Sequence, residues 1–313
     1  MQMKTKEKRP KSRMTVKQFK RELPLHMMLL LPVLFVLVFS YGSMAGIIMA
    51  FQDYIPGKGF YVFGSPFIGL ENFKQLIDLE PWSVLWNTVY IAGLKIITGL
   101  VVPVMLAILL NEVRHTWFKR GVQTAIFLPY FISWVIMAGM LVDILSPSTG
   151  VFARIADFFG TECPFFLGDN KWFPWVLVLS NLWKDAGYGV IVYLAAVTNI
   201  DPSLYEAATI DGAGYIKKTL HVTLPGITPV IVLMTILSLG NILNAGFDQV
   251  YNLYSPAVYQ SGDIIDTFVY RLGISEGQYS LSAAVGLFKS VVSFLFISGS
   301  YGIAYKCFDY RIF

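Results

Sequence analysis

The chain has 313 residues, of which 55% are hydrophobic and only 14% are charged, and its mean hydropathy is +0.59. About a quarter of the residues in a soluble domain are charged, so this composition excludes an ordinary soluble protein and predicts a polytopic membrane protein. The formal net charge of +4 says little about partners, because the basic residues are unevenly distributed along the chain.

The first 24 residues form a tail rich in Lys and Arg that runs directly into an apolar stretch, residues 25–51. Such tails bind nucleic acid in some proteins, but a tail that precedes a membrane span is typical of a cytoplasmic segment that contacts anionic lipid and fixes topology. We therefore expect no nucleic-acid partner. The apolar stretch is too long for the core of a signal peptide, so we expect it to be the first span.

Six apolar runs approach the ~20 residues that a helix needs to cross a bilayer. They predict an all-α membrane protein with a permease domain over 25–305. Pro103 and Pro129 are expected to kink the second and third spans. In the outer loops, a short amphipathic stretch over 151–159 and a partly helical segment over 251–280 are expected. The six spans are 25–51, 83–111, 121–145, 173–199, 225–250 and 281–305.

The basic residues predict the orientation of these spans. With the N-terminus inside, most of the 24 Lys and Arg residues lie on the cytoplasmic side, as the positive-inside rule requires. Both termini, the C-terminal tail 306–313 and the loop 201–225 are then cytoplasmic, in a multi-pass plasma-membrane protein. Cys163 and Cys307 fall on opposite sides of the membrane, so no disulfide is expected between them. The three histidines lie far apart in sequence and predict no metal site.

The loop 201–225 is the longest polar passage within the apolar part of the chain. Asp201 can cap a helix that starts at Pro202. A turn at Gly212 would follow, and a second short helix would end near Leu224-Pro225. This helix–turn–helix would form a compact knob on one membrane face. Its adjacent alanines would allow close approach of a partner, and Glu206 would offer a negative charge.

The spacing in this loop resembles a family pattern: Glu-Ala-Ala, three residues, Gly, nine residues, an aliphatic residue, any residue, then Leu-Pro. Permease subunits of binding-protein-dependent ABC importers carry it. Val222 stands where isoleucine is commoner. The resemblance implies that the loop docks on an ATP-binding subunit and couples transport to ATP hydrolysis; the alternative is an ordinary amphipathic loop. The implied coupling residues are Glu206, Ala207, Ala208, Asp211, Gly212, Leu224 and Pro225.

Further phrases, at 69–73, 128–134 and 193–208, resemble the carbohydrate branch of this family, in particular LplB-like oligosaccharide permeases related to those of the maltose importer. The resemblance implies the six-helix MetI-like fold and a sugar substrate. It also implies a second permease subunit, two copies of an ATPase subunit and an extracellular lipid-anchored binding protein. The chain has no Gly-x4-Gly-Lys-Ser/Thr phosphate loop, so we expect no enzymatic activity and no bound cofactor, with ATP-Mg on the partner.

Polar side chains within the spans suggest a path through the membrane, because intramembrane charges usually face protein or water. Lysines occur at 95, 184 and 289, and Asp185 and Tyr188 accompany a polar cluster in the fourth span. Aromatic and amide groups suit a sugar, but the same residues could serve as contacts between helices. The candidate path residues are Asn181, Trp183, Lys184, Asn241, Asn244, Asp248, Lys289 and Ser293.

Two other functions remain open from the residues. An ABC permease for an amino acid or peptide would share the coupling loop. An ion-coupled secondary transporter or channel would use the intramembrane lysines and Asp248 instead. An enzyme is the least expected class, because no His or Cys is placed with carboxylates in a shared membrane pocket.

Overall fold

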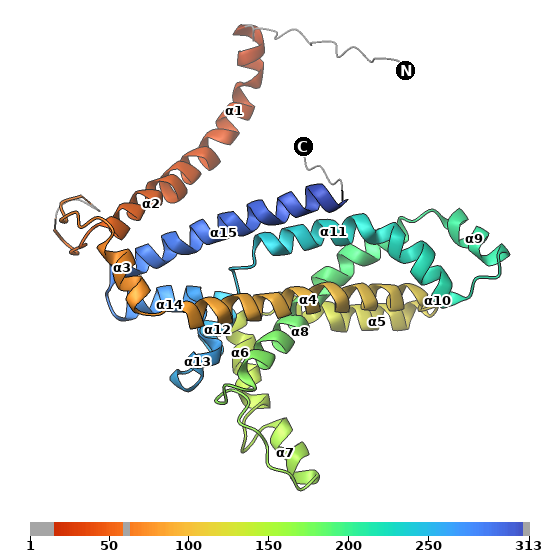
Figure 1. The fold of residues 1–313 in the computed structure, drawn as a ribbon. Coiled ribbons are helices and arrows are strands. Elements are labelled where there is room, and N and C mark those ends of the chain that lie inside the picture. Colours follow the sequence, from red (N-terminus) through yellow and green to blue (C-terminus); the bar gives the residue numbers. More distant parts are fainter. Residues whose placement is uncertain (1–15, 59–62, 309–313) are drawn as a thin grey trace.

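A computed structural model describes residues 16–58 and 63–308, and these residues are almost entirely helical. The long helices form an elongated bundle from which α1 leans away (Figure 1). The expected basic tail before residue 16 and the segment 309–313 lie outside the described residues. The all-α class is confirmed for the described part of the chain.

The first expected span is present as a helix. It consists of α1 (Val16–Val36), a π-helical turn (Leu37–Tyr41), α2 (Gly42–Met44) and a 3-10 segment (Ala45–Phe51). The part from Glu22 to Phe51 is apolar enough to cross a membrane, and its apolar core is not buried against the rest of the described chain. The bundle itself therefore gives this helix little packing.

By length and composition, four described helices can cross a membrane, and a fifth can if one bent pair counts as a single span. The four are Glu22–Phe51, Trp82–Glu112, Tyr215–Gly240 and Tyr279–Gly299. The expected fourth span is a helix of the right length, α8 (Phe173–Thr198), but its polar residues keep it outside this set. The structure thus supports several spans and leaves the number six as a prediction.

The third expected span is not one kinked helix. α5 (Thr116–Phe127), a 3-10 turn (Leu128–Phe131) and α6 (Trp134–Ile144) follow one another, and the two helical arms are bent by 108°. Pro129 lies in the turn and has no N–H for a helical hydrogen bond. The Ser133 hydroxyl then caps α6 by accepting from the N–H of Ile136. The predicted kink at Pro129 is therefore a break between two helices.

The fifth expected span begins near the predicted residue, but it ends about ten residues too early for the prediction, and the helix before it does not stop where expected. α10 (Tyr215–Lys218) continues through a π-helical turn (Thr219–Thr223) into α11 (Leu224–Gly240), so no helix ends at Leu224-Pro225. The π-helical turn lies just before Pro225, whose ring removes a backbone donor. α11 then stops at Gly240, and α12 (Phe247–Leu253) begins after a break at 241–246. A single helix over 225–250 does not exist.

The last span and the outer connections agree with expectation. α15 (Tyr279–Phe308) covers the sixth run and packs along α11 and α3 (Glu71–Asp78). α7 (Val151–Phe158) is the expected amphipathic helix. The segment after α12 is partly helical, with α13 (Tyr259–Gly262) and α14 (Ile265–Tyr270). The side chain of Cys307 lies outside the described side chains.

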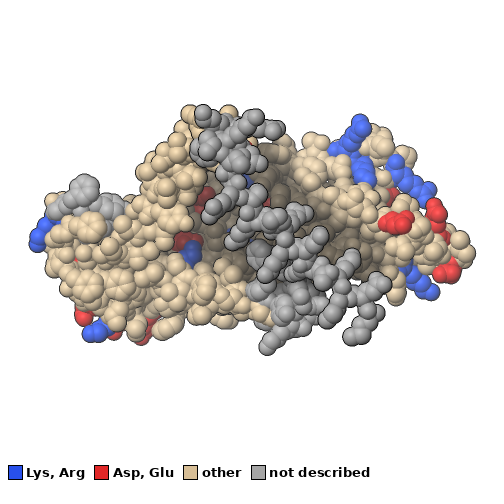
Figure 2. Space-filling model, turned by 90° about the horizontal axis from the view of Figure 1, so that it is seen from above, with Lys and Arg blue, Asp and Glu red and all other residues tan. Residues whose placement is uncertain are grey.

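The second span, α4 (Trp82–Glu112), packs along α8 and forms the centre of the bundle. One glycine of α8 lies at a close contact with the end of α5, next to the turn that leads to α6. A Cβ on Gly187 would lie 2.7 Å from the carbonyl oxygen of Ile126, so only glycine permits this approach. In the face shown in Figure 2, many of the visible charged side chains lie at the two ends of the molecule, and a few lie in the hollow between them.

Candidate functional site

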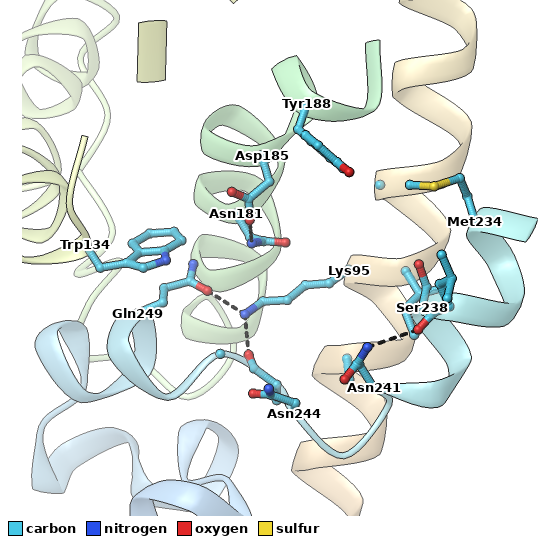
Figure 3. A pocket seen from close by; sticks show the side chains of 16 residues that line it. Lys95, Trp134, Asn181, Asp185, Tyr188, Met234, Ser238, Asn241, Asn244 and Gln249 are labelled. Atoms are coloured by element: carbon cyan, nitrogen blue, oxygen red, sulfur yellow. Dashed lines mark hydrogen bonds between the residues drawn. The ribbon is translucent and has the colours of Figure 1, made fainter. Parts of the chain in front are cut away.

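A polar cavity of about 520 Å³ lies at the centre of the bundle, between α4, α8, α11 and the break at 241–246 (Figure 3). It combines amides, a hydroxyl, two charged groups and two aromatic rings. Few apolar helices meet around so many hydrogen-bonding groups without a functional reason, because each unsatisfied polar group in a membrane is costly. Its polar and aromatic lining residues are Lys95, Trp134, Asn181, Asp185, Tyr188, Ser238, Asn241, Asn244 and Gln249.

Lys95 connects three helices at one side of the cavity. Its ammonium donates to the carbonyl oxygen of Ala245 at 2.6 Å and to Oε1 of Gln249 at 2.5 Å, as Figure 3 shows. Gln249 is fully buried, and its Nε2 donates to the carbonyl of Leu177 and the hydroxyl of Ser180, both at 2.7 Å. The Ala245 carbonyl is available because α11 has already ended. Lys95 therefore holds the broken segment against α4 and α8.

Other hydrogen-bonding groups of the cavity are not tied to Lys95. Asn181 donates to the Asp185 carboxylate across one turn of α8. Asn241 donates to the carbonyl of Leu237 at 3.1 Å, and Asn244 is exposed. Together with the Tyr188 ring, these groups could bind a small polyhydroxylated molecule, since such a ligand needs both donors and acceptors next to a flat apolar face.

Of the expected path residues, Asn181, Asn241 and Asn244 line the cavity and the other five do not. Lys184 is 8% exposed and donates to the carbonyl oxygen of Tyr130 at 2.8 Å, so it is a contact between helices. Trp183 is 43% exposed and does not line the cavity. Lys289 pairs with Asp266 of α14, and Ser293 is half-buried on α15.

Asp248 is the fifth residue outside the cavity, and the reason is the break. Its expected place on the path with Asn241 and Asn244 assumed the single helix over 225–250. Because α11 ends at Gly240 and Gly246 adopts a left-handed φ of 92°, the register changes. Asp248 is then exposed, and its neighbour Gln249 lines the cavity.

The other six polar and aromatic lining residues were not selected as site residues from the sequence: Lys95, Trp134, Asp185, Tyr188, Ser238 and Gln249. A signal existed for Lys95, since a lysine in a span needs a partner, and for Asp185 and Tyr188, which belong to the polar cluster of α8. No local signal marks Trp134 or Gln249. Their positions follow from the two helix breaks.

The loop 201–225 forms the expected helix–turn–helix, here called the elbow. The Asp201 carboxylate accepts the backbone N–H of Ser203 at 2.9 Å, which lowers the pKa of Asp201 and caps α9 (Pro202–Ile210). Gly212 has a φ of +72°, a conformation that other residues rarely adopt. The elbow projects from one end of the bundle (Figure 1).

Two hydrogen bonds fasten the two arms of the elbow to each other. The hydroxyls of Tyr205 and Thr223 lie 2.9 Å apart, and the Lys218 ammonium donates to the Thr209 hydroxyl at 2.8 Å. The apolar side chain of Ile210 is nevertheless 87% exposed. The coupling residues Glu206, Ala207, Asp211, Gly212 and Pro225 are exposed, and Ala208 and Leu224 are half-buried. The elbow is thus a braced unit with an uncovered surface.

A bundle of apolar helices around a polar cavity, with a braced elbow at one end, defines a multi-pass membrane transport component. Comparison with known proteins gives the family. Residues 99–305 match the family described as the inner membrane component of binding-protein-dependent transport systems, and the chain belongs to that family.

Two relatives come from Bacillus subtilis (strain 168). The polygalacturonan/rhamnogalacturonan transport system permease protein YteP is 42% identical, over 87% of this chain and 85% of its own length. The protein LplB is 40% identical, over 92% of this chain and 90% of its own length.

A solved structure is also similar. A chain of a bacterial ABC transporter involved in the import of the acidic polysaccharide alginate has a TM-score of 0.85 and 37% identity, and the match covers 93% of this chain and 98% of that one. A second structure of such a transporter contains an alginate-pentasaccharide-bound periplasmic protein.

Proposed function

We propose that this chain is the transmembrane permease subunit of an ABC importer for an oligosaccharide that an extracellular binding protein delivers. The observation that carries the proposal is the cavity between α4, α8 and the break at 241–246, which combines amide groups with aromatic rings. Such a lining suits hydroxyls and ring faces together. The permease YteP and the similar solved transporter are both named for the transport of polysaccharides, which supports a sugar over an amino acid, a peptide or an ion.

The proposed topology places both termini and the elbow in the cytoplasm. Basic residues at the end of the bundle that carries the elbow support it, because cytoplasmic loops are enriched in Lys and Arg. They are Arg114, Lys119 and Arg120 around the start of α5, and Lys217 and Lys218 in α10. An ATPase could then reach the elbow. The proposed partners are a second permease subunit, two copies of an ATPase subunit and a lipid-anchored binding protein, with bilayer lipid around the apolar helices.

In the proposed mechanism, the elbow docks on the ATPase subunit, which binds ATP-Mg and performs the hydrolysis. Glu206 and Asp211 offer charge to a cationic surface, and Ala207 and Ala208 allow a close approach. ATP must bind one arrangement of the complex better than the other to shift the population between them. Because the elbow is braced, it would move as a unit and change access to the cavity.

The sugar path in this proposal runs past Asn181, Asn241 and Asn244, with Lys95 and Asp185 at its wall. Trp183, Lys184, Asp248, Lys289 and Ser293 have no place in the central cavity. An ion-coupled transporter would also use Lys95 and Asp185, but it would not need the uncovered elbow.

The test is Glu206→Lys and Gly212→Pro in cells that express the complete importer. Each variant should remain in the membrane but lose sugar uptake, and sugar should no longer stimulate ATP hydrolysis. Proline cannot adopt the positive φ of Gly212. The matched control is Glu71→Lys on α3, an exposed charge reversal far from the elbow, which should keep uptake. Normal uptake in either elbow variant would refute the coupling.

A further inference from the structure

Five aromatic rings form a continuous series outside the central cavity, here called the aromatic ladder: Phe247, Tyr251, Tyr254, Tyr259 and Tyr270. Phe247 and Tyr251 stack at 5.3 Å with 18° between their planes. Tyr270 lies 5.5 Å from Phe247 and 4.8 Å from Tyr251. Tyr254 follows at 6.2 Å from Tyr251, and Tyr259 at 5.1 Å from Tyr254. All five side chains remain at least partly exposed, Tyr251 by 41%.

The inner end of the aromatic ladder faces a second cavity, of about 550 Å³. Phe247, Tyr270 and Tyr279 line it, together with the Asp266 carboxylate and the Ser282 hydroxyl. No lining residue is common to the two cavities, but they adjoin in sequence: Gly246 lines the central cavity and Phe247 lines the second. The aromatic ladder therefore leads away from the central cavity along α12 and towards α13.

The chemistry of this surface fits a chain of sugar rings. The faces of aromatic rings pack against the C–H faces of a pyranose, and the hydroxyls of a sugar bond with carboxylate and phenol groups. Asp266 supplies an acceptor, and its charge is compensated by Lys289. A belt of tyrosines at the lipid headgroups is the alternative explanation, but a belt does not require a hollow beside the rings that holds a carboxylate among apolar side chains.

We propose that the aromatic ladder and the second cavity bind successive units of an oligosaccharide on the outer side of the central cavity. This inference rests on the proposed function, because it requires a sugar substrate. Centroid separations of 4.8 to 6.2 Å place consecutive rings close enough for one saccharide chain to contact several of them. A long saccharide would use both sites, whereas a short one would fill the central cavity alone.

The experiment measures uptake of digalacturonate and pentagalacturonate by cells that express the complete importer. Tyr251→Ala and Tyr270→Ala should raise the KM for the pentamer about tenfold, which corresponds to ~1.4 kcal/mol, and should change the KM for the dimer less than about twofold. Tyr251→Phe keeps the ring and should restore pentamer uptake. Tyr251→Leu keeps apolar volume without a flat ring and should behave like the alanine variant, which separates stacking from loss of folding.

The control is Trp117→Ala on α5, an aromatic ring that is 77% exposed near the elbow and should leave both saccharides unaffected. Equal effects on dimer and pentamer, or no effect on either, would overturn the aromatic ladder as a saccharide site and leave the proposed function intact. Rings that serve only as a lipid belt would give one of these two results. If the unaltered importer takes up no oligosaccharide, the proposed function itself fails.

Discussion

Two helix breaks in this protein are held in the same way but have different surroundings. At 128–133, Lys184 of α8 donates to the carbonyl of Tyr130 at 2.8 Å, and its ammonium lies over the rings of Tyr130 and Trp134. At 241–246, Lys95 of α4 donates to the carbonyl of Ala245 at 2.6 Å. Each lysine satisfies backbone that a broken helix leaves unpaired, as a membrane interior requires.

The difference is that residues of the second break line the central cavity, whereas residues 128–133 of the first break do not. Lys184 is packed among aromatic rings, whereas Lys95 lines a cavity of about 520 Å³. An intramembrane lysine therefore does not by itself mark a substrate path. The break at 128–133 is a structural joint, and the break at 241–246 is the wall of the candidate path.

The largest effect on stability is expected from removal of Lys184, the lysine that holds the break at 128–133. In Lys184→Met, the Tyr130 carbonyl loses its partner in a dry environment, which costs about 1–3 kcal/mol, and the contacts with two aromatic rings are lost as well. Thermal unfolding of the purified chain in detergent should show a clearly lower midpoint. The control is Lys171→Met, which removes an exposed lysine near Trp172. Equal midpoints in the two variants would contradict a structural role for Lys184 at the break at 128–133.

Gly187, which packs against the chain just before the break at 128–133, gives a second test of how the two breaks differ. In Gly187→Ala the new methyl group would lie 2.7 Å from the Ile126 carbonyl oxygen, and such overpacking costs about 1–3 kcal/mol. Gly99→Ala is the matched control, since Gly99 lines the central cavity and has no atom within 4 Å of a new Cβ. We expect a lower unfolding midpoint only for Gly187→Ala. A similar decrease of the unfolding midpoint in both variants would mean that packing at Gly187 is no tighter than at Gly99 in the cavity wall.

At the break at 241–246, which lines the central cavity, removal of the lysine should reduce uptake more than it reduces stability. Lys95→Met frees the Ala245 carbonyl and Gln249 in a polar cavity, where water can replace the lysine. Uptake should fall about tenfold, equivalent to ~1.4 kcal/mol, while the unfolding midpoint falls less than in Lys184→Met. Uptake and unfolding should be measured on the same preparations. A stability loss as large as that of Lys184→Met would remove the distinction between the breaks.

The smallest effect is expected from single side chains at the cavity wall. Asn241→Ala removes one hydrogen-bonding group, worth about 0.5–1.5 kcal/mol, and should raise the KM for the transported sugar severalfold. Asp248→Asn alters an exposed residue outside the cavity and should leave the KM unchanged. Comparison of the two KM values tests whether the break at 241–246 places Asp248 outside the cavity. A larger change for Asp248→Asn would favour the unbroken helix that the sequence suggested.

Much of the architecture follows from apolar length and local signals. The runs at 83–111 and 281–305 became long helices, and Asp201, Pro202 and Gly212 defined the elbow because caps and turns depend on near neighbours. The breaks could not be predicted from an apolar count, because such a count finds runs of sufficient length and does not show where the helix within a run ends. Each break depends on a lysine from a distant helix. Errors at Asp248 and Gln249 follow directly from the missed break.

The helix from Tyr215 to Gly240 is continuous for 26 residues, which corresponds to about 39 Å at 1.5 Å per residue. It joins the elbow at one end to the wall of the central cavity at the other. The helix is not uniform, because it contains the π-helical turn Thr219–Thr223 and has Pro229 in its interior, the two features at which helices bend. In the proposed mechanism, a displacement of the elbow would reach the cavity wall through this helix, and the stiffness of these two points would set how far the wall moves.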